Sequence, residues 1–210
     1  MELVDAVAGN GTETNAQADA GAGVALVPGQ PVTIHITELE MTAAPKQSLP
    51  FPVNIQTALM RVVDIPPAYY RFLYLQVGRR WHWVDRLRLD DEALTAVLHD
   101  KRNCVTVLYV NGAPAGFFEV LHVDEDTVEL THFGLFERAL GLGLGKWFLL
   151  QALYGCWSYG PKVVKVQTNN LDHPRAIQLY QRFGFSPVAT REDELVPLTE
   201  DEMLDLVRKL

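Results

Sequence analysis

The feature of this sequence most suited to chemistry is a run of three alternating glycines, Leu140-Gly141-Leu142-Gly143-Leu144-Gly145-Lys146. It lies between a strand-like run, residues 128–135, and a helix-like run, residues 147–157. Glycine lets the backbone adopt positive φ angles and approach a ligand closely, and a helix N-terminus presents unpaired N–H groups with a partial positive charge. The junction is therefore suited to hold a phosphate, and an anionic cofactor is the first hypothesis.

A glycine loop alone is a weak signal, because dinucleotide-binding turns, kinase flaps, degenerate P-loops and ligand-free connections share it. A Walker loop needs Ser or Thr after Gly-Lys to hold magnesium, whereas Trp147 follows Lys146 here. A dinucleotide fold needs a parallel βαβ unit near the start of the chain. The strands expected before this loop are antiparallel, so the neighbouring sequence disfavours both of these readings.

The composition favours one folded domain without nucleic acid or membrane partners. The chain has 210 residues, 48% of them hydrophobic, which is enough for a core. A net charge of -8 and the lack of a basic stripe argue against binding to a phosphate backbone. The longest apolar run, residues 147–157, is well short of the roughly 20 residues that cross a bilayer. The residues before Lys46 lack the pattern of a secretory signal, so we expect a cytoplasmic protein.

Residues with metal-ligand chemistry are sparse and scattered. Cys104 and Cys156 have no CxxC spacing, so buried free thiols are expected. His82, His122 and His132 also lack metal-ligand spacing, and a satisfied imidazole is the default for each. The sequence therefore predicts no metal site.

Hydrophobic periodicity and turn signals outline the elements that must position the glycine loop. Residues 1–30 are poor in large apolar side chains, which predicts a disordered tail, and residues 31–210 are expected to form a single domain. Asn111-Gly112 is a strong hairpin signal, so three antiparallel strands should precede the loop. Before the glycine loop, we expect a strand over 32–41, a loop over 45–52, a helix from Pro66-Pro67 to Gly78, a helix capped by Asp90, and strands over 104–110, 113–123 and 127–135. After the loop, we expect a helix over 146–157, a strand over 162–168, a helix capped by Asp172 or His173 and ended by Gly184, and a strand over 185–190. A last helix of about 197–209 should begin with a capping box from Thr199 to Glu202.

Two motifs follow one another in this framework. A Gln/Arg-x-x-Gly-x-Gly/Ala loop is matched by Leu140, Gly143 and Gly145, or in a second register by Arg138, Gly141 and Gly143. An Asn-x-x-Ala-x-x-Leu-Tyr-x-x-x-Gly-Phe segment is matched by His173, Ala176, Leu179, Tyr180, Gly184 and Phe185. The motifs and their order resemble the acetyl-CoA-dependent N-acetyltransferase (GNAT) superfamily, which includes relatives of histone and aminoglycoside acetyltransferases. The resemblance covers roughly residues 66–190. Leu140 stands where the family usually has Gln or Arg, His173 stands where Asn is common, and the stretch after Phe185 is short for the family's two closing strands.

The resemblance implies an α/β fold, an acyl-CoA N-acyltransferase fold with a mixed, mostly antiparallel central sheet that is splayed into a V and flanked by helices. It implies acetyl-CoA as cosubstrate, with the pantetheine arm along residues 133–135 and the thioester oxygen at the Leu135 amide. The pyrophosphate would reach the amides of residues 141–146. The cofactor-binding residues implied in this way are Phe133, Gly134, Leu135, Gly141, Leu142, Gly143, Leu144, Gly145, Lys146 and His173.

Thioester aminolysis needs a neutral amine, a stabilised oxyanion and a proton for the departing thiolate. An alkyl ammonium has a pKa near 10, so a base must collect its proton, directly or through water. The resemblance implies a base six residues before the position that meets the thioester, which is Glu129, and Glu119 on the neighbouring strand is the second candidate. The resemblance also implies that the Tyr180 hydroxyl points at the sulfur, where a phenol with a pKa near 10 can protonate a thiolate.

The acyl acceptor should enter on the opposite side of the sheet, near the first two helices, where residues 69–71 and 79–83 combine aromatic and cationic side chains. The candidate substrate-binding residues are Tyr70, Trp81, Trp83 and Glu119. The alternative for each is an ordinary role in the core or in an ion pair. The expected activity is direct transfer of an acetyl group to the primary amine of a small molecule or peptide. An inactive acyl-CoA sensor or scaffold, a fold without any cofactor, and a homodimer all stay open.

Overall fold

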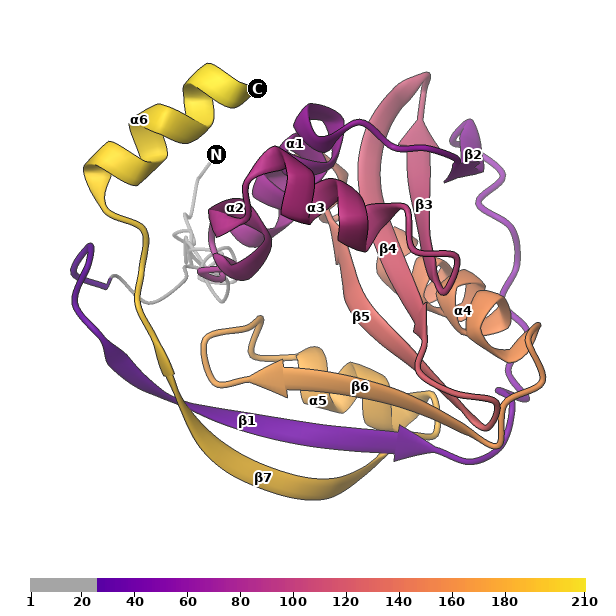
Figure 1. Cartoon of the computed structure of the whole chain (residues 1–210). Coiled ribbons are helices and arrows are strands. Elements are labelled where there is room, and N and C mark those ends of the chain that lie inside the picture. Colours follow the sequence, from indigo (N-terminus) through magenta and orange to yellow (C-terminus); the bar gives the residue numbers. More distant parts are fainter. Residues whose placement is uncertain (1–25) are drawn as a thin grey trace, which may run out of the picture.

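The computed structural model describes residues 26–210 (Figure 1). Most of the tail expected over residues 1–30 lies outside these residues. The part that is described, residues 26–30, contains a turn in which the Gly29 N–H donates to the Pro197 carbonyl at 3.0 Å. The described fold therefore begins a few residues before the expected boundary at residue 31.

One seven-stranded sheet runs through the domain, in the order β2-β3-β4-β5-β6-β1-β7 (Figure 1). Its strands are β1 (Val32–Met41), β2 (Thr57–Val62), β3 (Asn103–Val110), β4 (Ala113–His122), β5 (Thr127–Leu135), β6 (Val163–Asn169) and β7 (Ser186–Leu195). Every neighbouring pair is antiparallel except β5 and β6, which are parallel. The predicted meander of three strands is confirmed as β3, β4 and β5.

Helices cover both faces of this sheet (Figure 1). They are α1 (Pro67–Gly78), α2 (Asp85–Arg88), α3 (Asp91–Leu98), the 3₁₀ turn η1 (Glu137–Ala139), α4 (Leu144–Trp157), α5 (Ala176–Arg182) and α6 (Glu200–Lys209). Buried residues of α1, α2 and α3 pack on one face of β3 and β4, and those of α4 pack on the other, in a core cluster that also includes residues of β1, β6 and α5. Within residues 26–210, no helix has the length and apolar character that a membrane span requires.

The sheet opens into a V between β5 and β6. The two strands pair only over Thr127–Glu129 and Val163–Lys165. Beyond Glu129, no strand pairs with this edge of β5 in the described part of the chain. The predicted mixed, mostly antiparallel sheet splayed into a V is confirmed, and the strand backbone from residue 130 to residue 135 has one free edge.

Several predicted boundaries need correction. β2, α2 and η1 were not predicted, β7 extends to Leu195, and α4 begins two residues earlier than expected. The prediction that a side chain of Asp172 or His173 caps α5 is wrong, because Arg175 is the N-cap residue and makes no side-chain cap bond. A single closing strand, β7, follows Phe185, and β1 from the start of the described chain lies between it and β6. Of the two closing strands usual in the family, only one follows Phe185, and β1 occupies the place of the other in the sheet.

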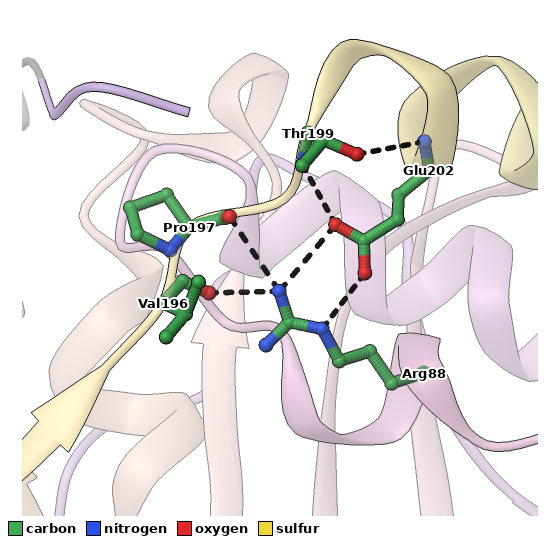
Figure 2. Close-up of polar contacts among 5 residues, drawn as sticks. All are labelled: Arg88, Val196, Pro197, Thr199 and Glu202. Carbon is green, nitrogen blue, oxygen red and sulfur yellow. Dashed lines mark hydrogen bonds and ion pairs between the residues drawn. The ribbon is translucent and has the colours of Figure 1, made fainter. Parts of the chain in front are cut away.

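The predicted capping box at the start of α6 is confirmed and is fixed to α2 by one arginine (Figure 2). The Thr199 N–H donates to Glu202 Oε2 at 2.7 Å, and the Glu202 N–H donates to Thr199 Oγ1 at 3.2 Å. Arg88 at the end of α2 donates to Glu202 Oε1 at 3.0 Å and to the Val196 carbonyl at 2.9 Å. The C-terminal helix is therefore held beside the helices that cover β3 and β4.

Candidate active site

A cleft of about 790 Å³ opens where β5 and β6 separate. One wall is the free edge of β5, and the opposite wall is formed by β6 and the start of α5. The glycine loop and the first turn of α4 close one end, and the segment that follows α1 contributes the remaining side. The divergence of two parallel strands thus creates the cavity, with the glycine loop as part of its wall.

The cleft is basic although the chain is acidic. Five of the chain's 18 Lys and Arg residues line the cleft, namely Lys146, Arg79, Arg80, Arg175 and Arg182. The described acidic lining consists of Glu137 and Asp172, two of 26 Asp and Glu residues. Charges of one sign that line a cleft attract a ligand of the opposite sign. This distribution favours an anionic ligand.

The glycine loop leaves the first N–H groups of α4 without a side-chain acceptor. Gly141 and Gly143 have φ angles of 78° and 74°, and a Cβ built on either would meet nothing within 4 Å. Gly143 is the N-cap of α4 and offers no side-chain cap bond, whereas Asp90 and Thr199 cap α3 and α6 with side-chain oxygens. Uncapped N–H groups at a helix start, beside open space, can donate to an anion.

The free edge of β5 presents backbone groups to the cleft. The Phe136 N–H donates to the Ala115 carbonyl of β4 at 2.8 Å. Because alternate N–H groups of an extended strand point to opposite edges, the Leu135 N–H points away from β4 and toward the open side. Phe133, Gly134 and Leu135 all line the cleft. Within residues 26–210, the backbone edge that the resemblance assigns to the pantetheine arm is therefore unpaired and accessible.

Tyr180 lies in the opposite wall, on α5. Its side chain is 8% exposed and lines the cleft, and its hydroxyl makes no hydrogen bond with any residue that the structure describes. Burial, together with the negative charge of Asp172, raises the pKa of Tyr180 well above its ordinary value. The phenol therefore stays protonated near neutral pH and is free to donate a proton or a hydrogen bond.

The two candidate bases have different surroundings. Glu129 is half-buried beside the point where β5 and β6 separate, outside the cleft lining, and burial raises its pKa above the ordinary value. Glu119 on β4 is fully buried, also outside the cleft lining. Burial alone would raise the pKa of Glu119, but the His132 ring and the Arg86 guanidinium lower it to about 2. Of the two carboxylates, Glu129 has the higher pKa and is the better proton acceptor.

Glu119 is the centre of a buried polar cluster that the sequence did not predict. Its Oε2 accepts hydrogen bonds from the Tyr70 hydroxyl and, at 3.2 Å, from Nδ1 of His132. Its Oε1 accepts a bond from Arg86 at 3.1 Å. Tyr70 is fully buried and does not reach the cleft. The structure thus brings Tyr70 and Glu119 together behind the cleft, and not in its wall.

Trp81 and Trp83 do line the cleft, and each contacts the opposite arm of the V. The Trp83 indole N–H donates to Asp172 Oδ1 at 3.2 Å. The rings of Trp81 and His173 lie with their centroids 5.4 Å apart. Since Trp81 and Trp83 follow α1 while Asp172 and His173 precede α5, these contacts bridge the cleft from one wall to the other.

The remaining predicted cofactor residues are distributed along the cleft. Lys146, Leu144, Gly145 and His173 line it, while Leu142 lies outside the lining. Burial and the nearby Arg175 and Arg80 charges lower the pKa of His173, so the ring is neutral at pH 7. In the second register of the loop motif, the Arg138 guanidinium donates to the carbonyls of residues 110, 113 and 114. Arg138 therefore holds the β3–β4 hairpin and is not directed at a cofactor.

The acetyltransferase (GNAT) family model matches residues 65–185. No curated protein has a sequence that matches this one. A functionally unknown conserved protein from Staphylococcus epidermidis has a TM-score of 0.53 and 15% identity, over 80% of this chain and 64% of its own. A GCN5-related N-acetyltransferase from Sphaerobacter thermophilus has a TM-score of 0.56 and 17% sequence identity, and the match covers 80% of this chain and 54% of that protein.

A third solved structure is an aminoglycoside acetyltransferase from an uncultured soil metagenomic sample, in complex with trehalose. Its TM-score is 0.50 at 15% identity, over 60% of this chain and 86% of its own. The chain spans less than two thirds of the length of the other two structures. At sequence identities this low, the structural similarity shows a shared fold and nothing more.

Proposed function

The chain belongs to the acetyltransferase (GNAT) family, and on that premise we propose that it is an N-acetyltransferase that transfers the acetyl group of acetyl-CoA to a primary amine by direct attack. The observation that carries the proposal is the basic cleft between β5 and β6, with uncapped helix N–H groups at one end and an unpaired strand edge along its side. Coenzyme A carries a diphosphate, a 3′-phosphate and an extended amide-containing arm. The cleft offers partners for each of these parts.

The fit to the coenzyme is supported at three places. The first N–H groups of α4, preceded by Gly143, suit a diphosphate. Lys146, Arg175 and Arg182 offer positive charge for the phosphates. The free edge of β5 offers backbone donors and acceptors to an extended amide chain, as a neighbouring strand would.

Acetyl-CoA supplies an activated thioester, and the chain's own groups supply the rest of the chemistry. The Leu135 N–H, which points to the open side of β5, donates to the developing oxyanion. The Tyr180 hydroxyl gives its proton to the departing sulfur, a role that suits a phenol kept protonated by burial. Glu129, with its raised pKa, receives the proton of the amine directly or through water.

The test combines binding with turnover. Calorimetric titration with CoA should show binding, and thiol release from acetyl-CoA should appear with at least one member of an amine panel. The panel contains polyamines, peptide N-termini and an aminoglycoside, the last because an aminoglycoside acetyltransferase shares the fold. Binding without any turnover would favour the alternative, an inactive acyl-CoA sensor. The lack of any CoA binding would overturn both.

A matched pair of tyrosines tests the proton donor. Tyr180→Phe should lower kcat by roughly 10²-fold or more while the CoA affinity changes less than about threefold, because general acid catalysis typically contributes 10²–10⁴-fold. Tyr154→Phe is the control, since the Tyr154 hydroxyl donates to the Gln47 carbonyl at 3.0 Å, outside the cleft. Equal turnover in the two variants would remove Tyr180 from the mechanism.

A further inference from the structure

The buried cluster around Glu119 holds an imidazole in a defined state. A carboxylate can only accept hydrogen bonds, so the Nδ1 atom of His132, 3.2 Å from Glu119 Oε2, must carry a proton. In the neutral ring the lone pair is then on Nε2. The Arg86 guanidinium, 3.1 Å from Glu119, supplies a fixed positive charge beside the carboxylate. The ring is thereby prepared to accept a proton at Nε2.

The orientation of His132 is fixed and its second nitrogen is available. The ring packs against Tyr74 and Trp83, with centroids 5.1 Å and 5.2 Å away. The side chain is 17% exposed, and Nε2 has no hydrogen-bond partner within residues 26–210. Trp83 contacts the His132 ring and also lines the cleft. The two residues next to His132 in the sequence, Thr131 and Phe133, line the cleft as well. The imidazole therefore lies immediately behind the cleft wall.

His132 is also closer than Glu129 to the position assigned to the thioester. A strand rises about 3.3 Å per residue, so His132 lies about 10 Å along β5 from Leu135, and Glu129 about 20 Å. A β-bulge leaves Thr131 without a pairing partner, because Glu119 pairs with His132 while Val120 pairs with Leu130. The extra residue turns His132 toward the face that Glu129 also occupies.

The charged and titratable groups around the imidazole come from four elements. Tyr70 and Tyr74 face it from α1, Arg86 from α2, Glu119 from β4 and Glu129 from its own strand. Burial raises the pKa values of both tyrosines well above the ordinary value, so neither exchanges a proton near neutral pH. Glu129 and His132 lie close enough for their charges to interact. This leaves Nε2 of the imidazole and the Glu129 carboxylate as the groups of this set that can receive a proton.

We propose that Nε2 of His132 is the first acceptor of the amine proton, directly or through one water, and that Glu119 is the positioning residue that fixes the imidazole. The inference rests on the proposed function and changes one of its steps, because the amine proton reaches Glu129 only after His132. The acceptor ammonium loses a proton to Nε2, its nitrogen forms the bond to the acyl carbon, and the C–S bond breaks as Tyr180 protonates the sulfur. The imidazolium then returns its proton to solvent through Glu129. Two protons leave the nitrogen in total. The first reaches solvent through His132 and Glu129, and the second, lost as the amide forms, restores the Tyr180 hydroxyl that protonated the sulfur, so no further reactant is needed.

The test uses the full chain and an amine that the wild-type chain acetylates. The wild-type kcat/KM should rise with pH through an inflection, because a general base must be deprotonated to accept the amine proton. His132→Asn keeps an N–H at the position of Nδ1 for Glu119 but has no base. It should lose at least about 10²-fold in kcat/KM and the inflection, with CoA affinity within twofold of wild type.

His122→Asn is the matched control, because His122 lies at the far end of β4 beside Tyr159 and should leave the profile unchanged. Glu119→Gln should move the inflection to lower pH, since removing the negative charge makes the imidazolium less favourable. If His132→Asn does not fold, an NMR titration of the wild-type imidazole decides the matter, because its nitrogens must titrate over the range of the kinetic inflection. An active wild-type chain whose profile survives in His132→Asn overturns this inference alone. A wild-type chain without any acetyl transfer overturns the proposed function as well.

Discussion

Replacing Gly143 by alanine should have two separable effects, one on the free energy of unfolding and one on coenzyme binding. Gly143 has φ 74° and ψ 6°, in the left-handed region. An L-residue there costs about 1–2 kcal/mol. A Cβ at Gly143 would meet nothing within 4 Å, so no steric overlap adds to that cost. The expected loss in the free energy of unfolding is therefore about 1–2 kcal/mol.

The chain contains a matched control for the backbone effect. Gly112 has φ 81°, also has nothing within 4 Å of a Cβ, and lies in the hairpin between β3 and β4. Gly112→Ala should therefore lose a similar free energy of unfolding in a urea titration. The two variants should differ in calorimetry. Gly143→Ala places a methyl group beside the N–H groups proposed for the diphosphate and should weaken CoA binding by about tenfold or more, or about 1.4 kcal/mol.

Two results would refute this reasoning. Equal CoA affinity in Gly143→Ala and Gly112→Ala would mean that the diphosphate does not lie at the start of α4. An unchanged urea midpoint in both variants would mean that the left-handed conformation is not maintained at these glycines in solution. A Gly143→Asn variant refines the second point, because asparagine tolerates this region better than alanine and should lose less stability.

Two further predictions concern stability. Acidification should remove the contribution of Glu119 to the free energy of unfolding, because the folded-state pKa of Glu119, about 2, lies below the ordinary 4.5. This contribution is present above pH 4.5 and is lost as the pH falls toward 2. The loss is on the order of 3 kcal/mol, and urea midpoints over this range should depend less on pH in Glu119→Gln than in wild type. Arg88→Ala should speed amide hydrogen exchange in α6 and cost about 1 kcal/mol, since the side chain joins Glu202 and the Val196 carbonyl to α2. Arg102→Ala, whose partner Asp100 is two residues away, should leave exchange in α6 unchanged.

The sequence predicts best those elements whose signals are local. Asn111-Gly112 predicts the β3–β4 hairpin, and the pair Thr199 and Glu202 predicts the start of α6, because each motif satisfies its own backbone groups. β2 carries no such signal. Its residues alternate weakly between exposed and half-buried, and it is an edge strand defined by its pairing with β3. Its existence depends on tertiary contacts that composition does not show.

The cap of α5 illustrates a competition that local rules cannot resolve. Asp172 is a favourable N-cap type placed shortly before the helix. Its carboxylate instead accepts from the Trp83 indole at 3.2 Å, from Thr168 Oγ1 at 2.8 Å and from the Asn169 N–H at 3.0 Å. Since Trp83 is 89 residues away, this contact becomes visible only when both arms of the V are assembled. The same applies to Glu119, whose partners Tyr70 and Arg86 are 49 and 33 residues away.

The bulge in β5 shows how one residue can decide which groups meet. Strict alternation along a strand would place Glu129, Thr131 and Phe133 on one face and His132 on the other. In the structure, Thr131 is the unpaired residue, and its hydroxyl donates to the Glu119 carbonyl at 3.0 Å. His132 then faces Glu119 and the α1 side, while Phe133 packs on Phe148 of α4. Because a bulge is a property of the pairing between two strands, periodicity within β5 cannot reveal it. The proton path that we propose therefore depends on the register of β4 and β5 as much as on the identity of any side chain.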